Sequence, residues 1–360
     1  MLCLLLLVPM ACTPAGEPGA ERNDDAAEQV DPDASDQDEP WGRYVSTEGD
    51  DSAPGTEDEP FGTLEHGLRQ LDAGERLIVR GGEYEERIEG VEMPHATEEA
   101  PTRIEAYPDE QPVVRGLLWL EGGAHWVLDG IDVTWDPEWG RSDEHMVKVT
   151  DGTDWVVRNA EISGARSYAG LLVAGTRTGE PARWELSGNC IRDTVPSNAT
   201  NQDHNLYVNT GLSAGPGLIE GNLLFGAPNG ENLKIGPGDA AGGAADVVVR
   251  NNTLYDAVQN VLMSEDSRDN TIERNILGRT AGETGNIVGY RLEGADNVAR
   301  DNIGFDAASI IENQEGGVGV EDGGGNEFPV DPEFASTDAC DGFEPTNRDV
   351  NGYGHHAVAR

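Results

Sequence analysis

Short apolar runs, each interrupted by a small residue or an asparagine, recur along most of the chain. The clearest of these segments are VLDGIDV, VVRNAEI, LSGNCIR, LIEGNLL, VVRNNTL, TIERNIL and VARDNIG. The asparagines at their equivalent positions are Asn159, Asn189, Asn222, Asn252, Asn275 and Asn302, which are 23 to 33 residues apart. This is the spacing of solenoid repeats, whose units are too small to bury their own apolar faces and therefore stack.

The repeating units are predicted to consist of strands. No stretch between the apolar runs has apolar residues at helical spacing, which excludes leucine-rich and helical solenoids. Each asparagine is expected at a corner between two strands, where it adopts left-handed backbone and stacks its amide on the next coil. One amphipathic helix is predicted near the start of the repeats, with Leu64, Leu68 and Leu71 as its apolar stripe.

These features resemble the right-handed parallel β-helix superfamily that includes pectate lyases and related polysaccharide lyases. Residues 44–64 and the helix after them resemble the N-terminal cap of that family, and residues 330–356 resemble its closing segment. The resemblance covers residues 44–354. It predicts an all-β, three-sheet solenoid with a short N-terminal capping helix. The same fold also hosts hydrolases, epimerases and binding proteins, so the fold leaves the activity open.

The charge of the chain narrows the choice of partners. The 360 residues include 68 Asp and Glu against 24 Lys and Arg, which gives a formal net charge of −44. A nucleic-acid partner needs a basic surface and is excluded, and docking on anionic membranes is disfavoured. Such a surface suits salty surroundings that screen self-repulsion, and the alternative is a surface that collects divalent cations.

The two ends of the chain differ from the repeats. Residues 1–12 are apolar but too short to span a bilayer, and they resemble a secretory signal. Their missing basic residues point to a start codon further upstream. The run ends at Cys12, as in bacterial lipoprotein signals that lipidate this cysteine, although Pro9 stands where that pattern prefers Leu. We expect an acidic disordered tether over 13–41, the β-helix over 42–354 and a tail over 355–360.

An exported protein meets an oxidising compartment, which permits a disulfide between Cys190 and Cys340. The sequence does not show that these two cysteines are close, so two buried free thiols are the expectation. The protein is expected to be a monomer, located outside the cell or on its surface.

The chain has only two lysines, Lys148 and Lys234. Aligning the inward residues of the first strand of each coil pairs Val147/Val149 with Leu171/Val173, Leu206/Val208, Leu233/Ile235 and Val261/Met263. The outward column between them is then Lys148, Leu172, Tyr207, Lys234, Leu262 and Val288. Since coils stack at about 4.8 Å, Tyr207 and Lys234 should be neighbours, and Lys148 should lie about 14 Å from Lys234.

Polar residues flank this column. One position before the strands, a second amide ladder is predicted from Asn205, Asn232, Asn260 and Asn286. One position further back are His204, Glu231 and Gln259, with Asp203 beside His204. Two long loops, residues 192–203 and 236–246, adjoin these strands, and long loops on a regular scaffold tend to frame a binding cleft.

The family resemblance implies roles for this column. In several polysaccharide lyases of this fold, a Lys or Arg on the first sheet removes the proton next to a uronate carboxylate. Lys234 is the expected base, and neutral lysine is favoured by desolvation or a nearby cation. Tyr207 would donate to the leaving oxygen, and His204 would orient or replace it. The expected substrate contacts are Asn205, Asn232, Lys148 and Arg291.

In that family Ca²⁺ or basic groups neutralise the uronate carboxylate. Asp203 and Glu231 are oxygen ligands of the kind that Ca²⁺ selects, so they are the expected metal ligands. The predicted reaction is therefore β-elimination of an acidic polysaccharide, assisted by Ca²⁺. Each of these side chains also fits an ordinary surface or turn role.

Two other functions stay open. A glycoside hydrolase needs two carboxyls that flank the scissile bond, and Asp203 and Glu231 would lie one rung apart. The Asp-Asp signature of this fold's polygalacturonases is absent from the column. The other candidate is a surface carbohydrate-binding or structural β-helix without turnover, with Tyr207 stacked on sugar rings. Lys234 would be needed for product formation in a lyase and only for affinity in a binder.

Overall fold

The computed structural model describes residues 42–358, except for 167, 177–180, 196–202 and 238–241. The predicted signal, Cys12 and the acidic tether lie outside the described residues. Within them the protein is all-β apart from helix α1 (Leu64–Arg69) and two 3-10 turns, η1 (Arg348–Val350) and η2 (His355–Ala357). No helix of this described part is long and apolar enough to cross a bilayer.

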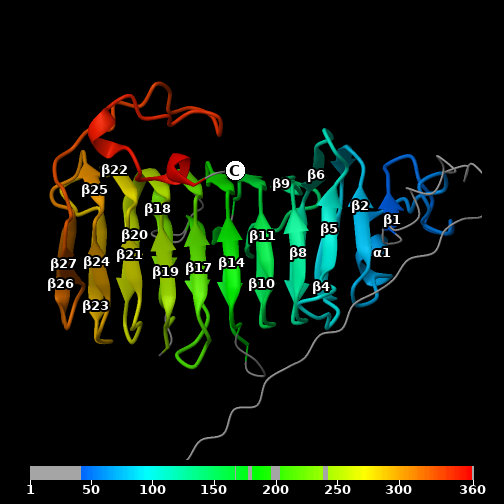
Figure 1. The fold of residues 1–360 in the computed structure, drawn as a ribbon, viewed down its shortest axis with the longest axis horizontal. Helices are drawn as coiled ribbons and strands as arrows, with labels where there is room; N and C mark the ends of the chain where they lie inside the picture. Colours follow the sequence, from blue (N-terminus) through cyan, green and yellow to red (C-terminus); the bar gives the residue numbers. More distant parts are fainter. Residues whose placement is uncertain (1–41, 167, 177–180, 196–202, 238–241, 359–360) are drawn as a thin grey trace, which may run out of the picture. The chain divides into compact units, whose positions relative to one another are not determined.

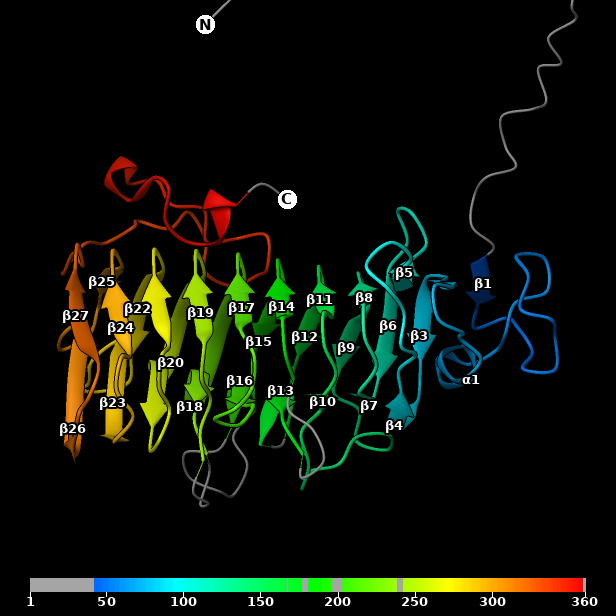
Figure 2. The ribbon, with the colours of Figure 1, turned by 60° about the horizontal axis from the view of Figure 1, so that its bottom comes forward.

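The strands stack in parallel on three faces of a β-helix, as Figures 1 and 2 show. Face 1 contains β4 (Arg87–Glu92), β7 (Leu117–Glu121), β10 (Val147–Thr150), β13 (Ala169–Ala174), β16 (His204–Asn209), β23 (Ile287–Leu292) and β26 (Ile311–Gly317). Face 3 contains β3 (Gly82–Tyr84), β6 (Pro112–Arg115), β9 (Asp132–Thr134), β12 (Glu161–Ser163), β15 (Cys190–Arg192), β22 (Ile276–Thr280) and β25 (Ile303–Phe305).

Face 2 is a continuous sheet between the other two. It contains β1 (Gly42–Val45), β2 (Arg76–Val79), β5 (Thr102–Ala106), β8 (Trp126–Asp129), β11 (Val156–Arg158), β14 (Trp184–Ser187), β17 (Gly217–Glu220), β19 (Val247–Arg250), β21 (Thr271–Glu273), β24 (Val298–Arg300) and β27 (Glu321–Gly324). Two long strands, β18 (Leu223–Ile235) and β20 (Thr253–Ser264), run from face 3 into face 1 of the next coil.

The register of face 1 confirms the predicted pairing along the column, although its members Leu262 and Val288 are buried. Lys148 pairs with Leu172, and the succession continues through Tyr207, Lys234, Leu262 and Val288. The inward partners on either side are buried, because alternate strand residues point into an apolar interior. The column also extends beyond the prediction, to Trp119 before Lys148 and to Glu312 after Val288.

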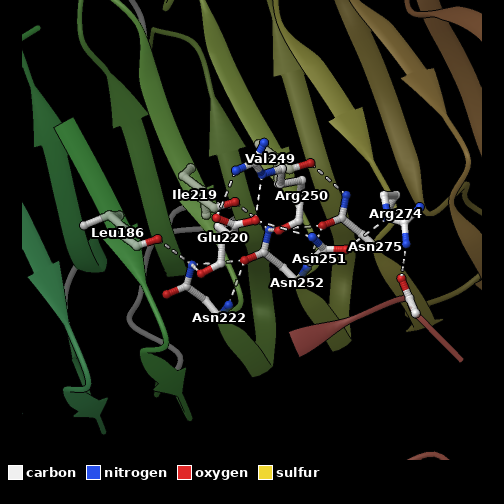
Figure 3. A network of polar contacts seen from close by, with 11 residues as sticks. Leu186, Ile219, Glu220, Asn222, Val249, Arg250, Asn251, Asn252, Arg274 and Asn275 are labelled. Carbon is white, nitrogen blue, oxygen red and sulfur yellow. Dashed lines mark hydrogen bonds and ion pairs between the residues drawn. The ribbon is translucent and has the colours of Figure 1, made fainter. Parts of the chain in front are cut away.

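A ladder of asparagines closes the corner between faces 2 and 3, as Figure 3 shows for its central coils. The Oδ1 of Asn252 accepts the backbone N–H and the Nδ2 of Asn222, at 2.8 and 3.0 Å. Its Nδ2 donates to the Ile219 carbonyl at 2.8 Å and to Asn275 Oδ1 at 3.0 Å. The same bonds connect the other members, so the ladder consists of Asn189, Asn222, Asn252, Asn275, Asn302 and Asn326.

The prediction was wrong at two points of this ladder. Asn159 lies outside it, donating to Asp129 Oδ1 at 2.7 Å, while Ala160 occupies the ladder position and donates its N–H to Asn189. The left-handed backbone belongs to the residue before each ladder asparagine, with φ of 52° at Asn251, and not to the ladder asparagine itself. That preceding position needs a residue that tolerates positive φ, whereas the asparagine after it provides the amide bonds.

The second predicted amide ladder consists of two bonded pairs. Asn205 Nδ2 donates to Asn232 Oδ1 at 2.8 Å, and Asn286 Nδ2 donates to Asn260 Oδ1 at 2.9 Å. All four side chains are fully buried. Their Nδ2 groups also donate to nearby backbone carbonyls, whereas the Oδ1 atoms of Asn205 and Asn286 are buried without a hydrogen-bond partner among the described residues.

Helix α1 lies where the sequence predicts it, except that it ends at Arg69, before the predicted stripe residue Leu71. Thr63 accepts a hydrogen bond from the His66 N–H, and the Glu86 carboxylate accepts the N–H groups of Leu64 and Glu65, so the free donors of the first turn are satisfied. Leu64 and Leu68 are buried, and the helix contacts β1, β2 and β4.

The C-terminal segment turns back from the last coils and covers part of face 3 (Figures 1 and 2). Phe343 is buried, with its ring 4.9 Å from Phe225 and 5.4 Å from Tyr255. A disulfide joins Cys340 to Cys190 of β15, so the expectation of two free thiols was wrong. The two cysteines are 150 residues apart in sequence, and their proximity depends on the path of this returning segment.

Replacing Cys340 by serine is expected to loosen the segment from face 3. The bridge restricts the unfolded chain, and removing a native disulfide typically costs about 2 to 5 kcal/mol. Limited proteolysis should then cut the variant between residues 330 and 358 faster than the wild type. Ser336→Ala, at an exposed position of the same segment, serves as the control and should keep the wild-type cleavage rate. Equal rates for Cys340→Ser and wild type would contradict the expectation.

Candidate functional site

The outward side of face 1 carries a group of aromatic rings and cations between β10 and β18. The Nζ of Lys234 lies 5.3 Å from the centroid of the Tyr207 ring, one coil away. The Tyr207 ring is also 5.9 Å from the ring of His145 and 5.8 Å from that of His204. Tyr168 completes the group, with its ring 5.5 Å from His145. The group thus combines residues of β16 and β18 with residues that precede β10 and β13.

The two lysines of the column differ in their partners. Lys148 forms an ion pair with Glu144, and its Nζ lies 3.8 Å from the Trp119 ring centroid. Lys234 forms no ion pair with any carboxylate in the described part of the chain. An unneutralised ammonium is notable in a chain with a net charge of −44. The charge of Lys234 is therefore not balanced by a carboxylate among the described residues.

His204 and Glu231 form a buried pair beneath this surface. Their side chains are 3% and 1% exposed, and His204 Nδ1 lies 2.6 Å from Glu231 Oε2. The Glu231 backbone N–H also approaches this nitrogen, at 3.1 Å. The shorter contact assigns the Nδ1 proton to the bond with the carboxylate. His204 is thus held in place next to Tyr207, as predicted for an orienting residue, and is too buried to replace Tyr207 at a substrate.

His145 belongs to this group and was missed by the sequence prediction. The Met146 N–H donates to the Ala169 carbonyl, and Ala169 is the strand partner of His204 on the next coil. His145 therefore stands before β10 at the position that His204 has at the start of β16. Its Nδ1 is buried without a hydrogen-bond partner among the described residues. Burial, with the nearby charge of Lys148, lowers the pKa of His145 to about 3. The imidazole is therefore neutral. The sequence analysis could have found His145 by extending the column of His204, Glu231 and Gln259 back to the segment before β10.

The depressed pKa of His145 predicts a loss of stability in acid. The unfolded chain binds a proton at this histidine below about pH 6.5, whereas the folded chain resists protonation until about pH 3. Stability therefore falls as the pH drops between these values. His145→Gln is expected to flatten this part of the stability curve, measured as the urea midpoint against pH. The exposed His95→Gln serves as the control, and equal slopes in all three proteins would contradict the assignment.

The two predicted calcium ligands, Asp203 and Glu231, are both buried and in contact with other side chains. Asp203 is fully buried, and its Oδ2 accepts the amide of Asn229 at 2.5 Å. The Glu231 carboxylate contacts His204. Among the described residues no three His, Cys, Asp or Glu side chains gather to hold a metal, whereas Ca²⁺ takes six to eight oxygen ligands.

The structure separates the remaining predicted substrate contacts from the group. Asn205 and Asn232 are fully buried and bonded to each other, so they cannot meet a polymer on the surface without a change in the interior. Arg291 lies on β23, two coils beyond β18, and forms an ion pair with Glu265 at 3.6 Å. Lys148, by contrast, stands on the predicted column, three rungs from Lys234.

Comparisons with known proteins agree with this architecture. No protein-family model matches the sequence, and no curated protein matches it. Among solved structures, pectate lyase Pel9A superposes with a TM-score of 0.53 and 10% identity, covering 83% of this chain and 84% of that one. A structure titled glycoside hydrolase has a TM-score of 0.52 and 10% identity, covering 79% of this chain and 96% of that one. At such identities the likeness is one of fold, and the chain shares the parallel β-helix fold of these proteins.

Proposed function

We propose that this protein is a carbohydrate-active enzyme, a polysaccharide lyase that cleaves a uronate-containing polymer by β-elimination on face 1. The observation that carries the proposal is the position of Lys234. Its ammonium has no carboxylate partner in the described part of the chain, and it lies beside Tyr207 on the outward column. The fold shared with a pectate lyase adds support, because that protein uses the same scaffold.

The two side chains divide the reaction between a base and an acid. Neutral Lys234 removes the proton from the sugar carbon next to the carboxylate, and the released electron pair forms the C4–C5 double bond. The C4–O bond breaks, and the Tyr207 hydroxyl protonates the leaving oxygen. Lys234 is then an ammonium beside a phenolate, so a proton that passes from Lys234 to Tyr207 restores both groups. Exclusion of water by the bound polymer favours the neutral lysine at the start.

His204 and Glu231 act as positioning residues in this scheme. Their buried contact fixes the imidazole whose ring lies 5.8 Å from Tyr207. A hydrolase is less well supported, because the carboxylates of Asp203 and Glu231 are both buried and engaged, whereas hydrolysis needs two carboxyls that face the bond. A cation that neutralises the substrate carboxylate stays a prediction.

The direct test incubates the purified full chain with polygalacturonate, alginate, hyaluronan and a neutral glucan, with and without chelator. β-Elimination creates an unsaturated sugar end, which is measured by its ultraviolet absorbance. A rise with a uronate polymer and none with the glucan is the expected result. Loss of that rise in chelator would add a cation requirement. Reducing ends without ultraviolet absorbance would indicate a hydrolase, and binding without any product would indicate a binder.

A further inference from the structure

A second polar cluster on face 1 contains Lys148, whose charge is neutralised by Glu144. Trp119 and Lys148 are partners on adjacent coils, and the Nζ of Lys148 lies 3.8 Å from the Trp119 ring centroid. Glu144 contacts Lys148 directly, and the two side chains are 29% and 19% exposed. The Trp119 Nε1–H donates to the His145 carbonyl at 3.0 Å, which anchors the segment that carries Glu144. This Lys148–Glu144 place is thus built from packed side chains.

The charges around this place favour an uncharged ligand. A second cation, Arg141, is shared between Glu89 at 3.5 Å, Asp143 at 3.3 Å and Glu144 at 3.9 Å. This part of face 1 therefore contains three carboxylates and two cations, which leaves it with a net negative charge. His145 is neutral and adds no charge. A carboxylate accepts hydrogen bonds from sugar hydroxyls and repels a second carboxylate, so Glu144 selects against an acidic sugar.

We propose that face 1 takes a mixed polymer, with a uronate at Lys234 and an uncharged sugar at the Lys148–Glu144 place. The two places are three rungs apart, which is about 14 Å along the stacked coils. Glu144 is the residue that determines this preference, because it neutralises a lysine that would otherwise hold a second carboxylate. The inference rests on the proposed function for its choice of a uronate polymer, but it concerns binding and does not require turnover.

The test compares two probes on the full chain, by calorimetry at low ionic strength. One is a galacturonate oligosaccharide, in which every unit is acidic. The other is a hyaluronan oligosaccharide of the same length, in which a uronate alternates with an uncharged hexosamine. We expect the wild type to bind the alternating probe more tightly. Glu144→Gln should tighten binding of the all-acid probe about twofold to fivefold, since an ion pair that still reaches solvent contributes little more than this.

Two variants separate this effect from a general change of charge. Asp143→Asn removes the same charge from the neighbouring, more exposed carboxylate, and it should leave the affinity for the all-acid probe nearly unchanged. The double variant Glu144→Gln/Lys148→Gln should lose the gain, because the lysine released by the first change is gone. Thermal melting checks that each variant is folded.

Several results would overturn the inference. These are a wild type that binds the all-acid probe as tightly as the alternating one, a wild type that binds neither, a gain shared by Asp143→Asn, and a gain that persists in the double variant. A different result would overturn only the proposed function. If the charge preference is found but no polymer gives an unsaturated product, the groove binds mixed polymers without cleaving them.

Discussion

Lys234→Ala is expected to abolish formation of unsaturated product while the fold stays intact. The Lys234 side chain projects outward and makes no ion pair in the described part of the chain, so the interior loses nothing when it is shortened. Proton transfer by a positioned side chain contributes about 10²- to 10⁴-fold to a rate. The initial rate of ultraviolet absorbance should fall by that factor, and the thermal midpoint should not change.

The design of this experiment separates catalysis from binding. Affinity for the best substrate is measured on the same variant, because a base lost from a lyase lowers turnover far more than binding. Arg300→Ala is the matched control, since this exposed cation lies on face 2, where it pairs with Glu273. It should keep full activity. If Lys234→Ala keeps full turnover, or loses affinity and rate in equal proportion, Lys234 is a contact and not the base.

Asn252→Ala is expected to be the most destabilising single change in the corner ladder. The asparagine connects three coils, through bonds to Asn222, Ile219 and Asn275. Alanine leaves the buried amide of Asn222 and the Ile219 carbonyl without these partners. A buried polar group that loses its partner costs about 1 to 3 kcal/mol, so the total loss should be about 3 kcal/mol or more. The urea midpoint should fall accordingly.

The neighbouring asparagine provides a control in the same turn. Asn251 has a φ of 52° and lies outside the ladder, with its Nδ2 3.4 Å from Glu220 Oε1 (Figure 3). Asn251→Gly preserves the backbone conformation, because glycine tolerates positive φ. Its stability should stay within about 0.5 kcal/mol of the wild type. Equal losses in Asn252→Ala and Asn251→Gly would show that the turn, and not the buried amide, holds the corner.

The sequence by itself determined the β-helix and the register of its first face. Strand side chains alternate between the two sides with a period of two, and a one-residue slip would expose the whole apolar set. The alignment of Val147, Leu206 and Leu233 therefore placed Lys148, Tyr207 and Lys234 on the outward side, where the structure has them. The same periodicity identified most of the asparagine ladder.

The predicted ladder differs from the observed one at positions where the apolar pattern does not define a single register. Asn159 precedes Ala160 in a turn whose apolar pattern fits either position, so only the bond from Ala160 to Asn189 shows which residue stands on the ladder. Asn326 follows a run of glycines, with no apolar strand to mark its repeat. Local pattern locates a corner to within a residue, but hydrogen bonds between coils decide which side chain occupies it.

Only the tertiary structure decided which polar residues of the site are accessible and which are partners. Alternation tells inward from outward, but burial also depends on what covers a face, and it is the fold that places His204 and Glu231 beneath the surface. The tertiary structure also brings Cys340 back to Cys190, across 150 residues. Such contacts join segments far apart in sequence, and their geometry depends on the path of the chain between them, which no local pattern of apolar and polar residues encodes.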